Sequence, residues 1–169
     1  MKVFIANQIL KVLAWCFENG SDDAGRIYQL LSKGYLTAPC VYGPAERLVI
    51  GDRVSKANTL FNTRSGTITV KTGVMFGHSC MILTGFHDYM KSGETRERVT
   101  LENACKDIII EEGVWVASGV IVIGPCRIGK NAVIGAGSVV VSDIPDGVLA
   151  AGNPARVIKK IEISNSSAG

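Results

Sequence analysis

The feature that most constrains the fold is an aliphatic residue that returns at every sixth position between residues 107 and 145. This period matches neither the helical repeat of about 3.6 residues nor the two-residue alternation of a strand. A second series, of small or branched residues, lies four positions after the first. The aliphatic series is Ile110, Val116, Val122, Ile128, Ile134 and Val140. The second series is Val114, Val120, Cys126, Ala132, Ser138 and Ile144.

Two interlocked series with one period predict short flat sides of three residues that are joined by corners. Gly119, Asn131 and Gly137 fall at the corners, where a sharp bend needs a positive φ angle. Stacked in register, such sides form a triangular prism of parallel β-strands whose aliphatic residues point to the axis. We therefore predict an all-β solenoid.

The period continues upstream at three positions, Val70, Phe76 and Ile82. From Ile82 to Ile110 the chain advances 28 positions, which is not a multiple of six. The chain must therefore leave the prism and return in a new phase, so we predict a protruding loop over residues 84–107. Long loops in compact solenoids are usually functional or disordered. This loop holds His87, one of only two histidines in the protein.

The first coil is predicted to be imperfect. Ile50 and Val54 begin the pattern, but they sit two residues out of phase with Val70. Either one corner is irregular or a short insertion lies near residues 63–66.

Residues 1–45 are predicted to form a helical cap over the open end of the prism. An apolar face recurs at helical spacing at Ile5, Ile9, Val12, Leu13 and Cys16. Ser21 is a suitable N-cap for a short second helix. Trp15 and Phe17 could alternatively anchor the first helix at a membrane surface, but Lys2 and Lys11 are few cations for anionic lipid, so we favour the cap.

Composition narrows the classes of function. A net charge of +3 without basic runs interleaved with aromatic residues argues against nucleic-acid binding. The five cysteines are odd in number and form no C-x-x-C pair, which favours a reducing, cytoplasmic location. Cys80 and Cys126 occupy the small inward position and are predicted to fill the core. Two histidines are too few for the three-histidine zinc site of β-helical carbonic anhydrases, and we expect no metal.

Over residues 48–160 the chain resembles the hexapeptide-repeat, left-handed β-helix acyltransferases, and among them the sugar O-acetyltransferases. The most specific segments are ILTGFH, GVWVAS and IGAGSVVVSDIPDGVLAAGNPARVIKKI. The resemblance implies a left-handed parallel β-helix over residues 46–149, followed by a C-terminal tail over residues 150–169. It also implies acetyl-CoA as the co-substrate and a homotrimer as the active unit, because a lone rod has no cleft of its own.

Acetyl transfer to an alcohol needs a base for the hydroxyl proton, and the resemblance of ILTGFH assigns this role to His87. A neutral imidazole, with a pKa near ~6.5, can accept the proton at physiological pH. Asp88 is its neighbour, but adjacent extended residues point apart, so its role near the acceptor stays open. Asn62 corresponds to an asparagine that faces the acceptor in related enzymes, or else it is a corner residue. His78 is predicted to point outward, as a surface or interface residue or as an acceptor contact.

The resemblance also implies a coenzyme site towards the C-terminal end. Trp115 and Ser118 would flank the thiol arm, Ala136 would offer its backbone to the pantetheine amides, and Arg156 would bind the phosphates. Each has a plainer reading: Trp115 as an interface residue, Ser118 and Ala136 as small surface residues, and Arg156 as a solvated charge.

The sequence therefore favours an acetyltransferase that acts on a hydroxyl group of a sugar or surface-polysaccharide precursor. Two alternatives stay open at this point. One is N-acetylation of an amino sugar or a small-molecule amine, and the other is a non-catalytic β-helical assembly subunit.

Overall fold

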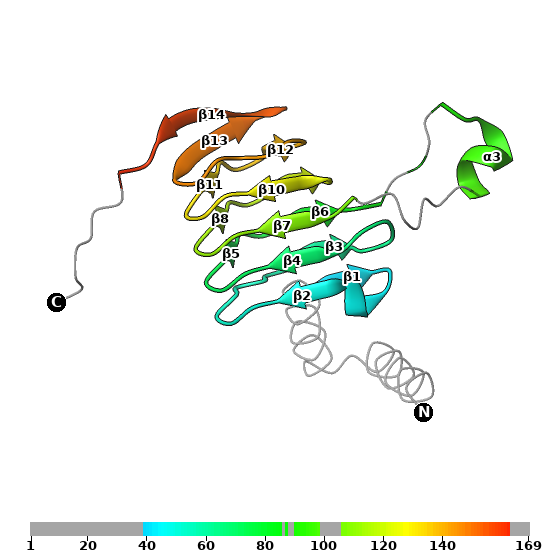
Figure 1. Ribbon diagram of the computed structural model, residues 1–169, viewed down its shortest axis with the longest axis horizontal. Helices are drawn as coiled ribbons and strands as arrows, with labels where there is room; N and C mark the ends of the chain where they lie inside the picture. Colours follow the sequence, from blue (N-terminus) through cyan, green and yellow to red (C-terminus); the bar gives the residue numbers. More distant parts are fainter. Residues whose placement is uncertain (1–38, 86, 88–89, 99–105, 163–169) are drawn as a thin grey trace, which may run out of the picture. The chain divides into compact units, whose positions relative to one another are not determined.

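A computed structural model describes residues 39–85, 87, 90–98 and 106–162 of the chain, with side chains in the loop helix described only as far as residue 95 (Figure 1). These residues belong to a compact unit that begins at Ala38. The N-terminal cap predicted for residues 1–45 falls almost entirely outside the described residues. None of the helices in the described part of the chain is long and apolar enough to cross a membrane.

The chain winds through three sheets in turn, one side of a triangular prism after another (Figure 1). The first sheet consists of β1 (Cys40–Tyr42), β3 (Leu60–Asn62), β6 (Met81–Leu83), β9 (Ile121–Ile123) and β12 (Val139–Val140). The second consists of β2 (Leu48–Ile50), β4 (Ile68–Val70), β7 (Ile108–Ile110) and β10 (Cys126–Ile128). The third consists of β5 (Met75–Phe76), β8 (Trp115–Val116), β11 (Val133–Ile134), β13 (Val148–Gly152) and β14 (Ala155–Lys160). A short 3₁₀ turn, Ala45–Arg47, precedes β2.

The register confirms the period that the sequence predicts. In the regular coils, Trp115 pairs with Val133 and Ile121 pairs with Val139, each 18 positions further along the chain. Eighteen residues are three sides of six, so one coil of the prism contains three hexapeptides. Among the residues that the structure describes, all strand pairs are parallel except β13 with β14.

Both predicted inward series are buried. Every member of the aliphatic series is fully inaccessible, and the members of the second series are at most 6% exposed. In the coils before the loop, the core holds the buried rings of Phe61 and Phe76, which pack edge to face with centroids 5.7 Å apart. The predicted corners are also confirmed, because Gly119, Asn131 and Gly137 have φ angles of 70°, 54° and 69°.

The irregular first coil contains the short insertion that the sequence allows. Phe61 and Val70 lie at equivalent inward positions on neighbouring sides, yet they are nine positions apart instead of six. The extra residues lie at residues 63–66. There, the buried Ser65 N–H donates to Thr84 Oγ1 at 3.2 Å, so the inserted turn is tied to the next coil.

The predicted loop leaves the prism after β6 and returns at β7. Ile82 pairs with Val122, 40 positions further on, so 22 residues are added to a coil of 18 without changing the register on either side. Within the loop, α3 (Gly93–Arg98) lies to one side of the strands (Figure 1).

The C-terminal segment is more regular than the tail predicted from residue 150. β13 and β14 form an antiparallel hairpin on the third sheet, with Asn153 and Pro154 in the predicted turn. The boundary that the sequence analysis places at residue 150 falls inside β13. The hexapeptide period could not reveal this hairpin, because an antiparallel strand does not repeat the inward position every six residues.

One corner between the second and third sheets is held by charge. Glu111 is nearly buried, and its Oε2 lies 2.8 Å from Lys71 Nζ on the preceding coil. Arg127, on the following coil, donates from Nε to Glu111 Oε1 at 3.0 Å and reaches Asp146 Oδ1 at 3.2 Å. The hydrogen bond from Lys71, and then that from Arg127, hold the pKa of Glu111 below its ordinary value.

The register can be tested with two isoleucines that are neighbours on β7. Ile110 is fully buried and Ile109 is 37% exposed. Ile110→Asp should unfold the protein, because an unpaired charge on a dry axis costs on the order of 4 kcal/mol or more. Ile109→Asp should fold like the parent. Thermal denaturation followed by circular dichroism measures both, and equal Tm values for the two variants would contradict the inward register.

Glu111 predicts how stability depends on pH. The pKa of Glu111 is lower in the folded protein than its ordinary value of 4.5. The ionised carboxylate therefore stabilises the fold fully at pH values above 4.5, and this stabilisation is lost as the pH falls through the pKa of the folded state. Glu111→Gln should therefore lower the Tm at about pH 7 and differ less from the parent at about pH 3. Glu46→Gln, at an exposed position, is the control. If the Tm of Glu111→Gln differed from that of the parent by the same amount at every pH, this role of Glu111 would be contradicted.

Candidate functional site

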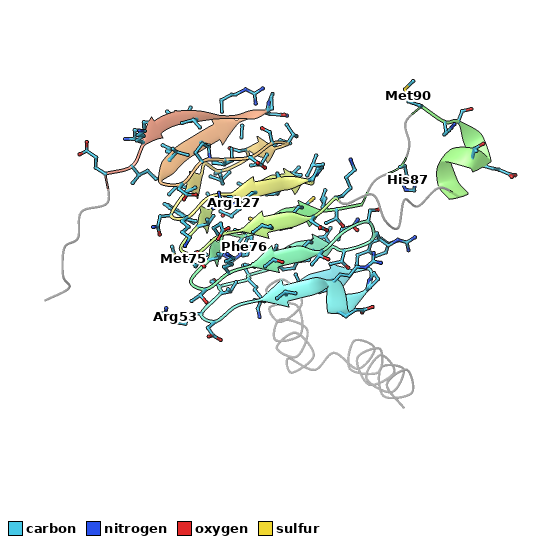
Figure 2. All side chains as sticks on the ribbon, in the orientation of Figure 1. Arg53, Met75, Phe76, His87, Met90 and Arg127 are labelled. Atoms are coloured by element: carbon cyan, nitrogen blue, oxygen red, sulfur yellow. The ribbon has the colours of Figure 1, made fainter. Side chains whose placement is uncertain are left out.

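The residues expected to bind coenzyme gather on the third sheet and on its corner with the first sheet. Trp115 on β8 is 48% exposed and faces outward beside Met75 on β5, which is 49% exposed. Figure 2 shows Met75 on the outside of the prism and its neighbour Phe76 inside it. Three positions after Trp115 the chain turns the corner at Ser118, which is exposed. An indole and a thioether therefore form an apolar surface next to this corner.

Ser118 and Ala136 occupy the same corner on successive coils. Both are exposed, and the Gly137 N–H donates to Ser118 O at 3.0 Å. His78 holds the equivalent place on the preceding coil: its N–H donates to Ser118 Oγ at 3.1 Å, and the Gly119 N–H donates to His78 O at 2.8 Å. We call His78, Ser118 and Ala136 the corner row.

The corner row depends on a close approach of two backbones. A Cβ atom at Gly77 would lie 2.5 Å from Ser118 N and 2.8 Å from its Cα. Only glycine fits at this position, and its absence of a side chain lets the Ser118 hydroxyl reach the backbone of the coil below. The hydroxyl is therefore fixed in direction by the fold.

The row continues towards the C-terminus into the β13–β14 hairpin. The Gly152 N–H donates to Ser138 Oγ at 3.1 Å, which joins the hairpin turn to the corner after Ala136. Across the hairpin, Arg156 pairs with Ala151. The Arg156 side chain is exposed, with one guanidinium nitrogen donating to Ala155 O at 2.9 Å. Arg156 thus lies at the C-terminal end of the line that begins at His78.

Asn62 lies on the opposite edge of the first sheet, under the start of the loop. Its Oδ1 accepts a hydrogen bond from the Arg64 N–H at 3.0 Å, and its backbone oxygen accepts one from Thr84 Oγ1 at 2.7 Å. A Cβ atom at Gly85 would lie 2.5 Å from Asn62 Nδ2. The carboxamide therefore fills the space where the loop departs, two residues before the exposed His87.

The chain thus presents two groups of candidate site residues on two edges. Trp115, Ser118, Ala136 and Arg156 lie together with His78, whereas Asn62 lies with the root of the His87 loop. Strand β6 separates His78 from Gly85, and its three residues alone span roughly 10 Å. Figure 2 shows His87 and Met90 on the loop, away from the labelled residues of the prism. Asp88 lies outside the described residues.

The cysteines next to these groups are part of the core, as predicted. Cys80 is buried beneath the corner row, where its Sγ lies 3.2 Å from Ala117 O, and burial raises the pKa of its thiol. Burial, and then the charge of Asp143, raise the pKa of Cys126 to about 12. Neither thiol can supply a thiolate nucleophile at neutral pH. Within the described ranges, no three His, Cys, Asp or Glu side chains gather to hold a metal ion.

Several residues of these surfaces were not singled out from the sequence. Met75 could have been found from the period, because it holds the same outward position as Trp115, one before an inward residue.

Asn58 and Ser79 also form a pair at this corner: the Ser79 N–H donates to Asn58 Oδ1 at 2.6 Å, and Asn58 Nδ2 donates to Ser79 Oγ at 3.3 Å. The insertion at residues 63–66 hides this pairing, because it puts the two residues 21 positions apart instead of 18.

Comparison with known proteins shows that the chain is similar to hexapeptide-repeat transferases and to acetyltransferases. Residues 107–142 match the family model for the bacterial transferase hexapeptide (six repeats). A galactoside O-acetyltransferase of Lactococcus lactis is 48% identical over 98 residues, which cover 58% of this chain and 45% of that protein. The chain thus spans about half the length of this curated relative.

Two solved structures are similar over most of the chain. A galactoside acetyltransferase in complex with coenzyme A superposes with a TM-score of 0.62 at 26% identity, covering 90% of this chain and 78% of the other. A hexapeptide-repeat acetyltransferase of Vibrio cholerae in complex with acetyl coenzyme A has a TM-score of 0.58 at 27% identity, with coverage of 85% and 80%. Together with the three sheets of parallel coils, these similarities confirm the predicted fold class, a left-handed parallel β-helix of hexapeptide repeats.

The contact between Asn62 and Gly85 can be tested by a double-mutant cycle. Gly85→Ala should destabilise the protein by about 1–2 kcal/mol, because the new methyl group collides with the Asn62 carboxamide. In an Asn62→Ala background the collision is gone, and the same change should be neutral or stabilising by up to about 1 kcal/mol. Chemical denaturation of the four proteins measures the coupling. Additive effects would mean that Asn62 does not determine where the loop departs.

Proposed function

Since the chain belongs to the hexapeptide-repeat, left-handed β-helix acyltransferase family, we propose that it transfers an acetyl group from acetyl-CoA to a hydroxyl group of a sugar or surface-polysaccharide precursor. The observation that carries this proposal is the continuous line from the corner row to Arg156. It combines an apolar surface, small exposed corner residues and a cation in the order in which an extended coenzyme would need them.

On this proposal the coenzyme lies along the Ser118 and Ala136 part of the corner row, with its phosphates at the C-terminal end. Arg156 binds a phosphate, for which a planar guanidinium with several donors is well suited. The exposed Lys159 and Lys160 on the same strand add positive charge at this end. The pantetheine arm runs past Ala136, and its thioester end reaches Ser118 beside the apolar surface of Trp115.

His87 acts as the general base. Its neutral imidazole accepts the proton of the acceptor hydroxyl as that oxygen attacks the thioester carbonyl carbon, and a tetrahedral intermediate forms. When the intermediate collapses, the C–S bond breaks and the imidazolium returns the proton to the departing coenzyme A sulfur. The products are the acetyl ester and free coenzyme A, and His87 is neutral again.

We further propose a homotrimer, in which each site lies between two copies. The two groups of candidate residues lie on opposite edges of the first sheet, so one copy would supply the corner row and its neighbour the His87 loop. Exposed apolar residues on or next to the outer face of this sheet support a contact between copies: Met81, Ile123 and Val141. Closed cyclic symmetry is the usual arrangement of such homo-oligomers.

Chemistry and coenzyme binding can be separated by two variants. His87→Ala should lower kcat by roughly 10²- to 10⁴-fold with little change in the affinity for acetyl-CoA, because the loop lies outside the repeat. Arg156→Ala should weaken coenzyme binding by about 1–3 kcal/mol while leaving the rate at saturation nearly unchanged. Calorimetric titration with coenzyme A and release of free thiol from acetyl-CoA with a panel of hydroxyl and amino sugars measure the two effects.

Lys91→Ala, at an exposed position on the same loop, is the control for His87→Ala. Sedimentation equilibrium of the parent gives its oligomeric state. A His87→Ala variant with full kcat would remove the base from this proposal. A parent protein that does not bind coenzyme A would leave the non-catalytic alternative.

A further inference from the structure

The N-terminal member of the corner row, His78, lies beyond the part that the proposed coenzyme site uses. His78 is exposed on the coil below, and its backbone is bonded to the Ser118 hydroxyl. On the next coil down, Asn58 meets Ser79 through two hydrogen bonds, of 2.6 and 3.3 Å. An imidazole, a carboxamide and a hydroxyl group therefore stand in line with the residues of the coenzyme site, but on the side away from Arg156.

We propose that His78, together with the Asn58–Ser79 pair, binds the sugar acceptor, and that His87 reaches this acceptor from a neighbouring copy of the chain. The inference rests on the proposed function, because the direction of the coenzyme defines where its thioester ends. If the phosphates lie at Arg156 and the thioester lies at Ser118, the acceptor must approach from the next position on the line. That position is occupied by His78.

The positions of the two histidines along the prism axis support this arrangement. His78 lies three positions before the start of β6, and the loop that carries His87 follows the other end of the same strand. A three-fold axis parallel to the prism keeps every coil at the same height in all copies. The loop of one copy then meets the next copy at the coil of His78, one coil below Ser118. Neighbouring coils are roughly 4.8 Å apart, so the acceptor hydroxyl would lie within reach of both the base and the thioester.

The chemistry of the three side chains indicates the class of acceptor. Carboxamide and hydroxyl groups both donate and accept hydrogen bonds, and a neutral imidazole does the same through its two nitrogens. Such groups match the hydroxyls of a neutral sugar, each of which also donates and accepts. The Asn58–Ser79 pair is held by its own hydrogen bonds, so these groups are oriented before the sugar binds. We therefore assign a neutral, polyhydroxylated acceptor to this surface.

The first test uses methyl β-galactoside as the acceptor probe. His78→Ala should raise the KM for the galactoside about tenfold, the effect of one lost hydrogen bond, without changing kcat or the KM for acetyl-CoA by more than about twofold. His78→Gln keeps a donor and an acceptor and should recover the KM to within roughly threefold. The His78 backbone bonds do not involve its side chain, so both variants should fold. Asp52→Ala, on the corner between the second and third sheets, is the surface control.

The outcomes separate this inference from the proposed function. A parent that binds no coenzyme A overturns the proposed function. A parent that binds coenzyme A but does not acetylate the galactoside overturns the assignment of a neutral sugar. An unchanged galactoside KM in His78→Ala removes His78 from the acceptor site, even if His87→Ala is inactive as expected.

The second test asks whether the two histidines come from different copies. Trimers co-expressed from the His78→Ala and His87→Ala chains should contain both wild-type histidines at about a quarter of their sites, if each site takes one histidine from each neighbour. At a galactoside concentration far below KM, their activity should exceed the mean of the two separate variants by roughly fivefold. If both histidines came from one chain, no such site could form. Activity equal to the mean would overturn the shared arrangement.

Discussion

The stacking of parallel coils in register is the interaction on which the rest of the structure depends. Each strand has only two or three residues in most of the prism, so a flat side is stable only because its backbone bonds and inward side chain continue into the coils above and below. Val122, for example, pairs with Ile82 on one side and with Val140 on the other. The role of a residue is therefore set by its place in the coil. Inward positions can hold only apolar or small side chains, and chemistry is restricted to outward positions and corners.

The same constraint explains how the prism carries a long loop without losing its register. The loop and the short insertion at residues 63–66 both lie at corners between the first and second sheets. The loop starts over the Asn62 carboxamide and ends where Lys106 passes close to two glycines, since a Cβ atom at either Gly66 or Gly124 would collide with the Lys106 carbonyl group. Directly afterwards, Asp107 Oδ1 accepts the Thr67 N–H at 2.7 Å. Both ends of the loop are thus fixed to the prism, and the residues between them can serve a function.

The hexapeptide period was sufficient to predict the core, the corners and the position of the loop, because in a solenoid these depend on spacing alone. It could not predict the β13–β14 hairpin, where the chain reverses direction and the period ends. The sequence suggests the candidate site residues as one set, whereas the structure places them in two groups on opposite edges of the first sheet. His78 and His87 are only nine positions apart, yet a strand separates them, whereas His78 and Ser118 are 40 positions apart and hydrogen-bonded. That second contact was in principle calculable, since 40 is one coil of 18 plus the 22 residues added by the loop.

If the coenzyme lies along the corner row, the prism divides donor and acceptor between different coils. Ser118 and Ala136 fall within residues 107–142, the segment that matches the hexapeptide family model, while His78 and Asn58 fall outside it. The regular coils then present the features that any acetyl-CoA-dependent member would need. The lower coils and the loop carry the insertions, the polar pair at Asn58 and Ser79, and both histidines. Substitutions in the irregular coils could therefore change the choice of acceptor without disturbing the packing of the regular coils that present Ser118 and Ala136 to the coenzyme.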